Sequence, residues 1–157
     1  MKTAIFDKTI SLEYPDDFYE MNEEEIKRFF GGDTLRFGVR NADKHVILSV
    51  SKTKKSFLNI FLTPKNILTG AESALRQNLK DYNCLEAFET KMLSKKGIGI
   101  HFTYSAIDKN VKQFCEMVVV KYKSCFYITY CLARFEDKLE NEKVFESFID
   151  SLSAIAK

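Results

Sequence analysis

Apolar residues recur at every second position in two neighbouring stretches of the chain, residues 35–39 and 46–50. Such alternation is typical of β-strands with one buried face. A loop at 41–44 would join the two stretches into an antiparallel hairpin with Val39 opposite Val46 and the next two apolar pairs in line. Because all three pairs then share one face, we predict this register. The apolar positions are Leu35, Phe37, Val39, Val46, Leu48 and Val50.

Turn and cap residues define shorter elements before this hairpin. Strands are expected at 4–6 and 9–13, joined by a tight turn. Asn22 and Glu25 have the spacing of a capping box, in which each side chain bonds the other residue's backbone. A short helix is therefore predicted from this box to Gly31, which can end it in a conformation that favours glycine.

Two further helices are predicted from caps and apolar spacing, and one segment stays open. The apolar segment 56–62 is compatible with a short helix or a strand. A capping box at 69–72 predicts a helix that continues to about Lys80. Its inner stripe would consist of Ala71, Ala74, Leu75 and Leu79. The segment 138–155 has the spacing of an amphipathic helix, with apolar residues at Phe145, Phe148, Ile149, Leu152 and Ile155.

A β-meander fills the chain between these two helices. Turn residues separate stretches rich in β-branched and aromatic side chains, which predicts four consecutive antiparallel strands. The expected strands are 84–94, 98–107, 112–121 and 124–134, and the expected turns lie at 95–97, 108–110 and 122–123.

The last two strands are apolar on both faces and must be covered on both faces. We therefore predict an α+β fold, a three-layer α/β/α sandwich around an antiparallel β-meander, in a single domain spanning 1–157. The face that carries Arg36, Arg40, Ser49 and His101 is expected to be less fully covered and to form a partly polar concavity.

The order of elements resembles the PsbP-like fold family. The resemblance rests on the N-terminal hairpin with Ser11-Leu12-Glu13-Tyr14-Pro15, the aromatic Phe18, the long meander and the closing helix around 145–152. This family includes the photosystem II extrinsic protein, a Ran-binding nuclear-import factor and many bacterial proteins of unknown role. It implies an accessory subunit or protein-binding module with no shared catalytic residues. The chain departs from the pattern in having no Trp, where many relatives carry one after the Tyr-Pro segment.

Charge is segregated along the chain although the formal net charge is only +2. The local charge is −7 over 13–25, +6 over 36–65, +5 over 91–123 and −4 over 136–150. Such blocks form either solvated faces that pair with one another or a bipolar surface that orients a charged partner. The lysines lie in separate turns and the aromatics alternate into the core, which argues against nucleic acid.

Residues with catalytic or metal-binding chemistry do not form a recognised motif. There is no glycine-rich phosphate loop, Gly-x-Ser-x-Gly or His-Glu-x-x-His. The cysteine spacings match no zinc site, and we interpret Cys84, Cys115, Cys125 and Cys131 as small buried side chains, although Cys115 and Cys131 could pair in one strand register. We expect no cofactor, no metal and no catalytic residue.

Two functions remain open from sequence. The first is a non-catalytic protein-interaction or accessory domain whose charged surface meets a protein partner. The second is a small anionic-ligand-binding protein or enzyme whose site on the polar sheet face uses Arg36, Arg40 and His101. The N-terminus lacks the apolar stretch of about 7–15 residues of a secretory signal, and no apolar run reaches the length of a membrane span. A cytoplasmic location is therefore expected.

Overall fold

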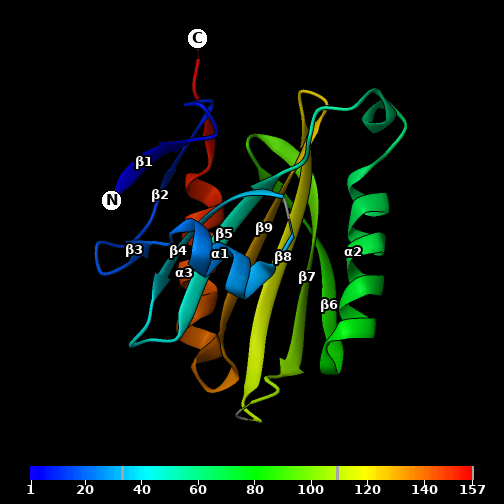
Figure 1. Ribbon diagram of the computed structural model, residues 1–157. Helices are drawn as coiled ribbons and strands as arrows, with labels where there is room; N and C mark the ends of the chain where they lie inside the picture. Colours follow the sequence, from blue (N-terminus) through cyan, green and yellow to red (C-terminus); the bar gives the residue numbers. More distant parts are fainter. Residues whose placement is uncertain (33, 109, 157) are drawn as a thin grey trace.

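A seven-stranded antiparallel sheet runs through the centre of the computed structural model, which describes residues 1–32, 34–108 and 110–156 (Figure 1). Its strand order is β3-β4-β5-β9-β8-β7-β6. The strands are β3 (Tyr19–Glu20), β4 (Leu35–Asn41), β5 (Val46–Lys52), β6 (Lys80–Met92), β7 (Lys95–Ser105), β8 (Lys112–Tyr122) and β9 (Cys125–Arg134). A second sheet combines β1 (Lys2–Ile5), β2 (Ile10–Glu13) and β10 (Ser153–Ala154).

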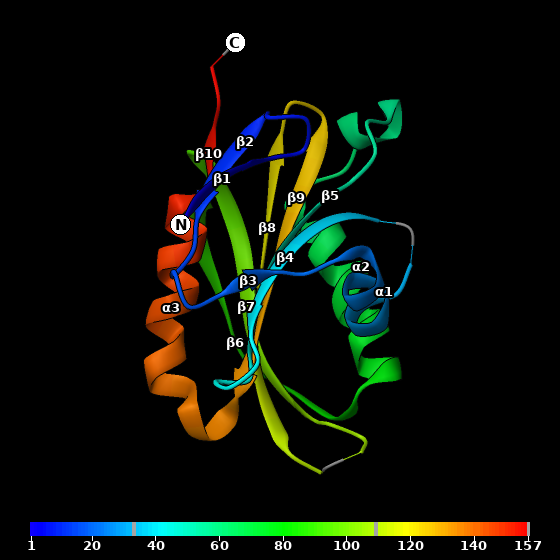
Figure 2. The same cartoon turned by 60° about the vertical axis from the view of Figure 1, so that its left-hand side comes forward.

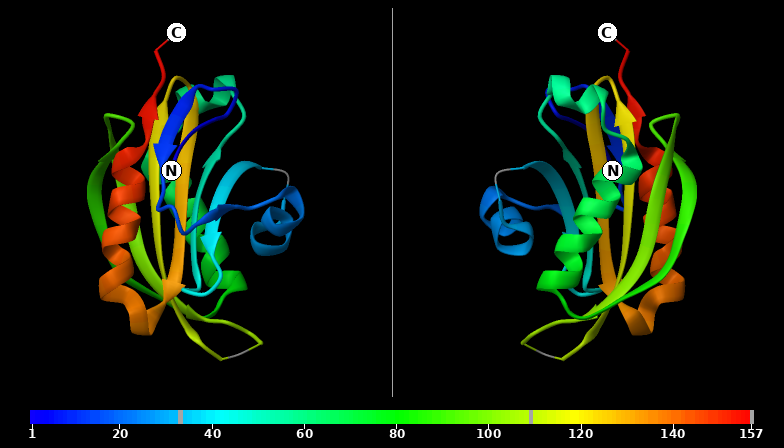
Figure 3. Two further views of the ribbon diagram at one scale, coloured as in Figure 1. Left: turned by 90° about the vertical axis from the view of Figure 1, so that its left-hand side faces the viewer. Right: turned by 90° about the vertical axis from the view of Figure 1, so that its right-hand side faces the viewer.

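Helices cover both faces of the large sheet (Figures 2 and 3). The α-helices are α1 (Glu23–Phe30), α2 (Pro64–Asn78) and α3 (Lys138–Ser151), and short 3-10 turns form η1 (Phe57–Ile60) and η2 (Phe135–Asp137). Helix α3 lies on one face, while α1 and α2 lie on the other. The predicted mixed fold, with helices on both sides of an antiparallel sheet, is confirmed.

The sheet separates two apolar cores. The core under α3 contains Phe114, Phe145 and Phe148, together with residues of the small sheet. The core under α2 contains Phe102 and Phe126. Alternate residues of β8 and β9 point into the two cores, which explains why these strands are apolar at nearly every position.

The predicted register of the β4–β5 hairpin is wrong by two positions, although its buried face is right. Val39 lies opposite Leu48, and Asn41 lies opposite Val46. The strand continues through Asn41 because the Asn41 side chain is hydrogen-bonded both to Asp17 and to the turn that follows the strand. Its amide donates to the Asp17 carboxylate at 2.9 Å, and its Oδ1 accepts from the Lys44 backbone at 3.0 Å.

Helix α2 begins five residues earlier than the predicted capping box. Thr63 and Asn66 form the actual box, in which the Asn66 backbone donates to Thr63 Oγ1 at 3.2 Å. Pro64 occupies the first helical position, where its missing N–H costs nothing. The inner stripe therefore gains Leu68, while Ala74, which was expected there, is exposed.

The β6–β7 turn is shorter than predicted and lies earlier in the chain, whereas the β8–β9 turn has the predicted length and lies one residue later. The β6–β7 turn consists of Leu93 and Ser94, and the β8–β9 turn consists of Lys123 and Ser124. All four residues have φ between 48° and 63°, the conformation that two-residue hairpin turns need. The predicted turn at 108–110 includes Lys109, which lies outside the described residues.

The last helix also ends before its predicted limit. Helix α3 stops at Ser151, and Ser153–Ala154 pair with β2 as a short strand. The Ile155 backbone donates to the Thr9 carbonyl at 3.0 Å, so Ile155 continues this extended segment and is exposed instead of lying on the helix. The chain end thus fastens the small sheet to the α3 side of the molecule.

We predict that Phe145→Ala lowers the free energy of unfolding by about 3–5 kcal/mol, the usual cost of removing a buried aromatic ring. The Phe145 ring is fully buried and stacks on Phe114, with centroids 5.9 Å apart. Urea denaturation checks the value. Leu139→Ala at the start of the same helix is the control, because Leu139 is 79% exposed and its truncation should cost little. Equal losses in both variants would contradict the packing described.

Candidate functional site

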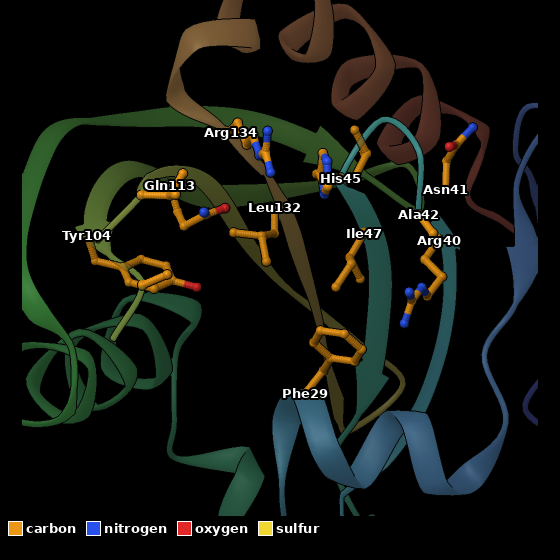
Figure 4. Close-up of a pocket in the computed structure, with 13 residues that line it drawn as sticks. Phe29, Arg40, Asn41, Ala42, His45, Ile47, Tyr104, Gln113, Leu132 and Arg134 are labelled. Atoms are coloured by element: carbon orange, nitrogen blue, oxygen red, sulfur yellow. The ribbon is translucent and has the colours of Figure 1, made fainter. Parts of the chain in front are cut away.

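A pocket of about 280 Å³ opens beneath α1 at the end of the sheet where β4 turns into β5 and β8 begins (Figure 4). Its apolar side chains come from α1, β5, β9 and the segment before β8. The apolar residues include Phe29, Ile47, Val111 and Leu132, and the polar ones include Arg40, His45, Tyr104, Gln113 and Arg134.

Helix α1 forms the roof of this pocket, and its sequence fixes its position. The predicted capping box is confirmed, since the Glu25 backbone donates to Asn22 Oδ1 at 2.9 Å and the Asn22 backbone donates to Glu25. The helix packs on β4 at Gly38, where an added Cβ would lie 3.0 Å from the Ile26 side chain. A larger residue at this position would push the helix away from the sheet.

Arg40 is held at the pocket edge by α1. Its guanidinium lies 3.4 Å from Glu25 Oε1 and 5.2 Å from the centroid of the Phe29 ring. Its side chain is only 18% exposed, so the guanidinium is held in a defined place. Glu25 therefore both caps the helix and positions a cation beside the pocket.

Arg134 lies across the pocket on β9 and is less constrained. Its nearest carboxylate is that of Glu136, at 3.7 Å, and the Glu136 side chain is 70% exposed. Ion pairs with such exposed partners contribute little, so this guanidinium can exchange its partner readily. Burial raises the pKa of the Tyr104 phenol in the same wall, so its hydroxyl stays neutral and can donate a hydrogen bond.

The arrangement combines an apolar surface with two guanidinium groups, which suits an amphipathic anion. Among the described residues that line the pocket there is no serine, threonine, cysteine, lysine or carboxylate. The lining therefore offers apolar surface and several hydrogen-bonding groups that can bind a ligand.

The structure does not bring the three predicted site residues together. Arg36 and Arg40 lie on the α1 face of the sheet, whereas His101 lies on the α3 face. Arg36 is enclosed outside the pocket, with its guanidinium 4.2 Å from the Phe30 ring centroid and donating to Ser49 Oγ at 3.0 Å. Burial lowers its pKa to about 10, which leaves it cationic at neutral pH.

His101 bridges two carboxylates on neighbouring strands. Its Nδ1 lies 2.6 Å from Glu86 Oε1, and its Nε2 bonds Glu116, which is buried. Both carboxylates are directly opposite His101 in the register of β6, β7 and β8. Burial by itself lowers the pKa of His101, but the bonds with Glu116 and Glu86 outweigh it and raise that pKa. Because both ring nitrogens are occupied, we interpret His101 as a cross-strand tie.

Four polar residues of the pocket were not predicted as site residues from the sequence: Arg134, His45, Tyr104 and Gln113. They are brought together because strand ends and turns meet at one end of the sheet. The only available signal was their position beside turns, where polar residues are usually solvated.

The cysteines and possible metal ligands give no further site. Cys115 lies opposite Leu132 and Cys131 opposite Glu116, so the two thiols point to opposite faces and their proposed pairing is wrong. All four cysteines are free thiols. Within residues 1–32, 34–108 and 110–156, no three His, Cys, Asp or Glu side chains are grouped as a metal site.

No family model matches this chain, and a search of curated proteins finds no relative. Solved structures do match it. The cyanobacterial PsbP (CyanoP) from Synechocystis sp. PCC 6803 superposes with a TM-score of 0.70 at 11% identity, covering 99% of this chain and 92% of that chain. The chain has a PsbP-like fold.

Other proteins with this PsbP-like fold differ widely in sequence. The Ran-binding protein Mog1p of Saccharomyces cerevisiae matches at a TM-score of 0.63 and 5% identity, over 97% of this chain and 93% of its own. LpqN of Mycobacterium tuberculosis, described as involved in cell envelope biogenesis, matches at 0.58 and 14%, over 99% and 90%. Among the residues that the structure places, no helix combines the length and the apolar character that crossing a bilayer requires.

We predict that His101→Gln removes a pH-dependent part of the stability. A raised pKa in the folded state means that protonated His101 stabilises the fold fully below about pH 6.5, the unfolded value, and that this contribution is lost as pH rises through the folded pKa. The difference in free energy of unfolding between wild type and variant should therefore shrink from pH 5.5 to 9.

Urea denaturation at several pH values measures this difference. His45→Gln is the matched control, since His45 is exposed and forms no ion pair within the described residues. A difference between wild type and His101→Gln that stays constant across this pH range would show that folding does not raise the pKa of His101.

Proposed function

We propose that this protein is a non-catalytic accessory domain that binds a partner protein, and that the pocket beneath α1 holds an apolar segment of the partner next to a carboxylate. The observation that carries this proposal is the lining of the pocket. It joins apolar side chains to Arg40 and Arg134, and its described residues include no serine, threonine, cysteine, lysine or carboxylate.

The two arginines support different parts of this role. Guanidinium groups bind carboxylates through paired, charge-assisted hydrogen bonds. Arg40 is already positioned by Glu25 and Phe29, so it orients the ligand without further ordering. Arg134 can leave the exposed Glu136 for a carboxylate of the partner, because the present ion pair is worth little.

Fold neighbours and charge add support to a binding role. One neighbour, Mog1p, is a Ran-binding protein. Four of the seven carboxylates in the acidic block 13–25 form ion pairs, for example Asp17 with Lys44 at 2.7 Å, so the block contributes less to a bipolar surface than its charge of −7 indicates. An anionic partner would instead meet cationic groups at the pocket.

We also propose a cytoplasmic location, with which four free thiols are compatible.

A second candidate function uses the same pocket for a free small molecule. Its volume is near the lower end of the range for small-molecule sites, which fits an amphipathic monocarboxylate of modest length. Of the three residues predicted to bind an anion, only Arg40 lines this pocket. Arg134 provides the second cation, while His101 and Arg36 lie outside the pocket.

We predict that octanoate raises the melting temperature of the protein, whereas octylamine does not, because only the carboxylate pairs with the guanidinium groups. Arg134→Gln should weaken octanoate binding roughly tenfold or more, the usual effect of losing a charged hydrogen bond. Arg76→Gln, on the outer side of α2, should leave the affinity unchanged. Thermal shift and calorimetry measure both effects. Equal responses to octanoate and octylamine would contradict an anion site.

A photo-crosslinking residue at Gln113 distinguishes a protein partner from a free metabolite. A partner that inserts into the pocket should crosslink in native lysate, and excess octanoate or Arg134→Gln should abolish the crosslink. The same crosslinker at Leu139, an exposed position on α3, is the control. If octanoate binds but displaces no crosslinked protein, the pocket serves a small molecule.

A further inference from the structure

Five large apolar side chains are exposed together on the segment Phe57–Leu62, which we call the apolar tip. Phe57, Leu58, Ile60 and Phe61 are between 59% and 73% exposed, and Leu62 is 37% exposed. The segment contains η1 and stands clear of the sheet beyond the end of α2 (Figure 1, upper right, and Figure 3). Such a concentration of exposed apolar residues usually marks an interaction site.

Polar contacts hold this segment with its apolar side chains outward. The Ser56 hydroxyl accepts from the Leu58 backbone at 3.2 Å and caps the turn. Asn59 is the buried residue of η1, and its side chain donates to the Ser124 carbonyl at 2.8 Å and to the Lys54 carbonyl at 3.2 Å. The usual arrangement, with apolar residues inside and polar ones outside, is reversed here.

Lys121 adds a further support from β8. Its ammonium donates to the carbonyls of Asn59, Ile60 and Leu62, at 2.9 Å in the case of Leu62. These carbonyls close the end of the turn, where backbone groups lack partners within the turn. The side chains of Phe57 and Phe61 meet edge to face, with centroids 6.3 Å apart. The turn is therefore built as a defined projection from the sheet.

Cationic side chains surround the apolar tip. From His45 to Ala71 the chain has no acidic residue but carries Lys52, Lys54, Lys55 and Lys65. Lys54 and Lys55 line one groove with Lys123 from the β8–β9 turn. Lys65 lines another groove with Lys91 and Lys96, where Glu89 is the single carboxylate. None of Lys54, Lys55, Lys65 and Lys123 forms an ion pair within the described part of the chain.

We propose that the apolar tip inserts into the interface of an anionic phospholipid bilayer, while the surrounding lysines contact the lipid phosphates. Apolar and aromatic side chains enter the boundary between headgroups and acyl chains, and lysines add electrostatic attraction to anionic lipid. The projecting shape of the apolar tip favours a bilayer over a protein surface as its partner. Exposed side chains on a projecting turn can be surrounded on all sides by a fluid interface, whereas a protein would need a matching deep groove.

This proposal is independent of the pocket. The apolar tip lies at the end of the sheet where β8 turns into β9, and the pocket lies at the other end, where β8 begins. A domain held on a membrane through its apolar tip would therefore present the pocket away from the lipid surface.

The absence of tryptophan from the chain makes the test direct. Phe57→Trp introduces a single indole at the apolar tip of the full-length protein. Its emission should shift to shorter wavelength with vesicles of phosphatidylcholine and phosphatidylglycerol at 7:3, and brominated acyl chains should quench it. Leu139→Trp, at a site that is 79% exposed on α3, should show neither effect.

Sedimentation with the same vesicles separates the two contributions to binding. Phe57→Ser/Phe61→Ser should reduce the bound fraction at least tenfold, and Lys54→Gln/Lys55→Gln should weaken binding by about fivefold for each lysine. Leu139→Ser and Lys143→Gln are the matched controls on α3 and should bind like wild type. Circular dichroism verifies that each variant is folded, which is expected since the altered side chains are exposed.

Three outcomes would overturn the proposal. The first is no binding of folded wild type to the anionic vesicles, and the second is equal binding to pure phosphatidylcholine, which would remove the role of the lysines. The third is a dimer in light scattering that Phe57→Ser/Phe61→Ser converts to a monomer without vesicle binding in either form. That result would assign the apolar tip to a second copy of this chain.

Discussion

The burial of both faces of β8 and β9 is the constraint on which the rest of the structure depends. These two central strands place Phe114 and Val118 on one side and Cys115 and Phe126 on the other, all with almost no exposure. A sheet that is apolar on both faces is stable in water only when both faces are covered. Helices α3 and α2, with α1 beside it, supply these covers, and the remaining strands extend the sheet between them.

The two candidate binding features lie where this covering ends. At one end the strands extend beyond α1, and the gap between helix, strand ends and turns is the pocket with Arg40 and Arg134. At the other end the chain between β5 and α2 leaves the sheet, and its apolar residues stay outside as the apolar tip. The two ends of the double-sided core thus share cationic and apolar side chains but differ in shape. One end is a cavity and the other is a projection.

Local patterns predicted the elements well, whereas relations between distant strands could not be read from them. Alternation placed Arg36 and Arg40 on one face of their hairpin and His101 on one face of its own strand. Whether these faces coincide depends on the register of every strand pair from β4 through β5, β9 and β8 to β7. A shift of one residue in any of these pairs moves the side chains of a strand to the opposite face of the sheet. The predicted site placed all three residues on one face, and this was wrong because His101 lies on the opposite face.

The segment 56–62 contains a short 3-10 helix at Phe57–Ile60, which is one of its two predicted alternatives. Apolar runs normally enter the core, so the pattern did not indicate that these side chains are exposed. The deciding residues are Asn59 and Lys121, which are 62 positions apart and hold the turn from inside. Hydrogen bonds over such distances have no local signal. The pocket was missed in the same way, since Arg40 and Arg134 line one cavity only after β4, β5 and β9 have paired.

The tie formed by His101 has a consequence for the outer edge of the sheet. Strand β6 is an edge strand, paired only with β7, and its bulges interrupt the backbone ladder at two places. Deprotonation of His101 would leave the Glu86 and Glu116 carboxylates facing across β7 without a cation between them. Strand β6 would then be held less firmly, and its detachment would uncover the backbone of β7 as a template for pairing with other chains. The charge state of His101 thus bears on how firmly the edge strand covers β7.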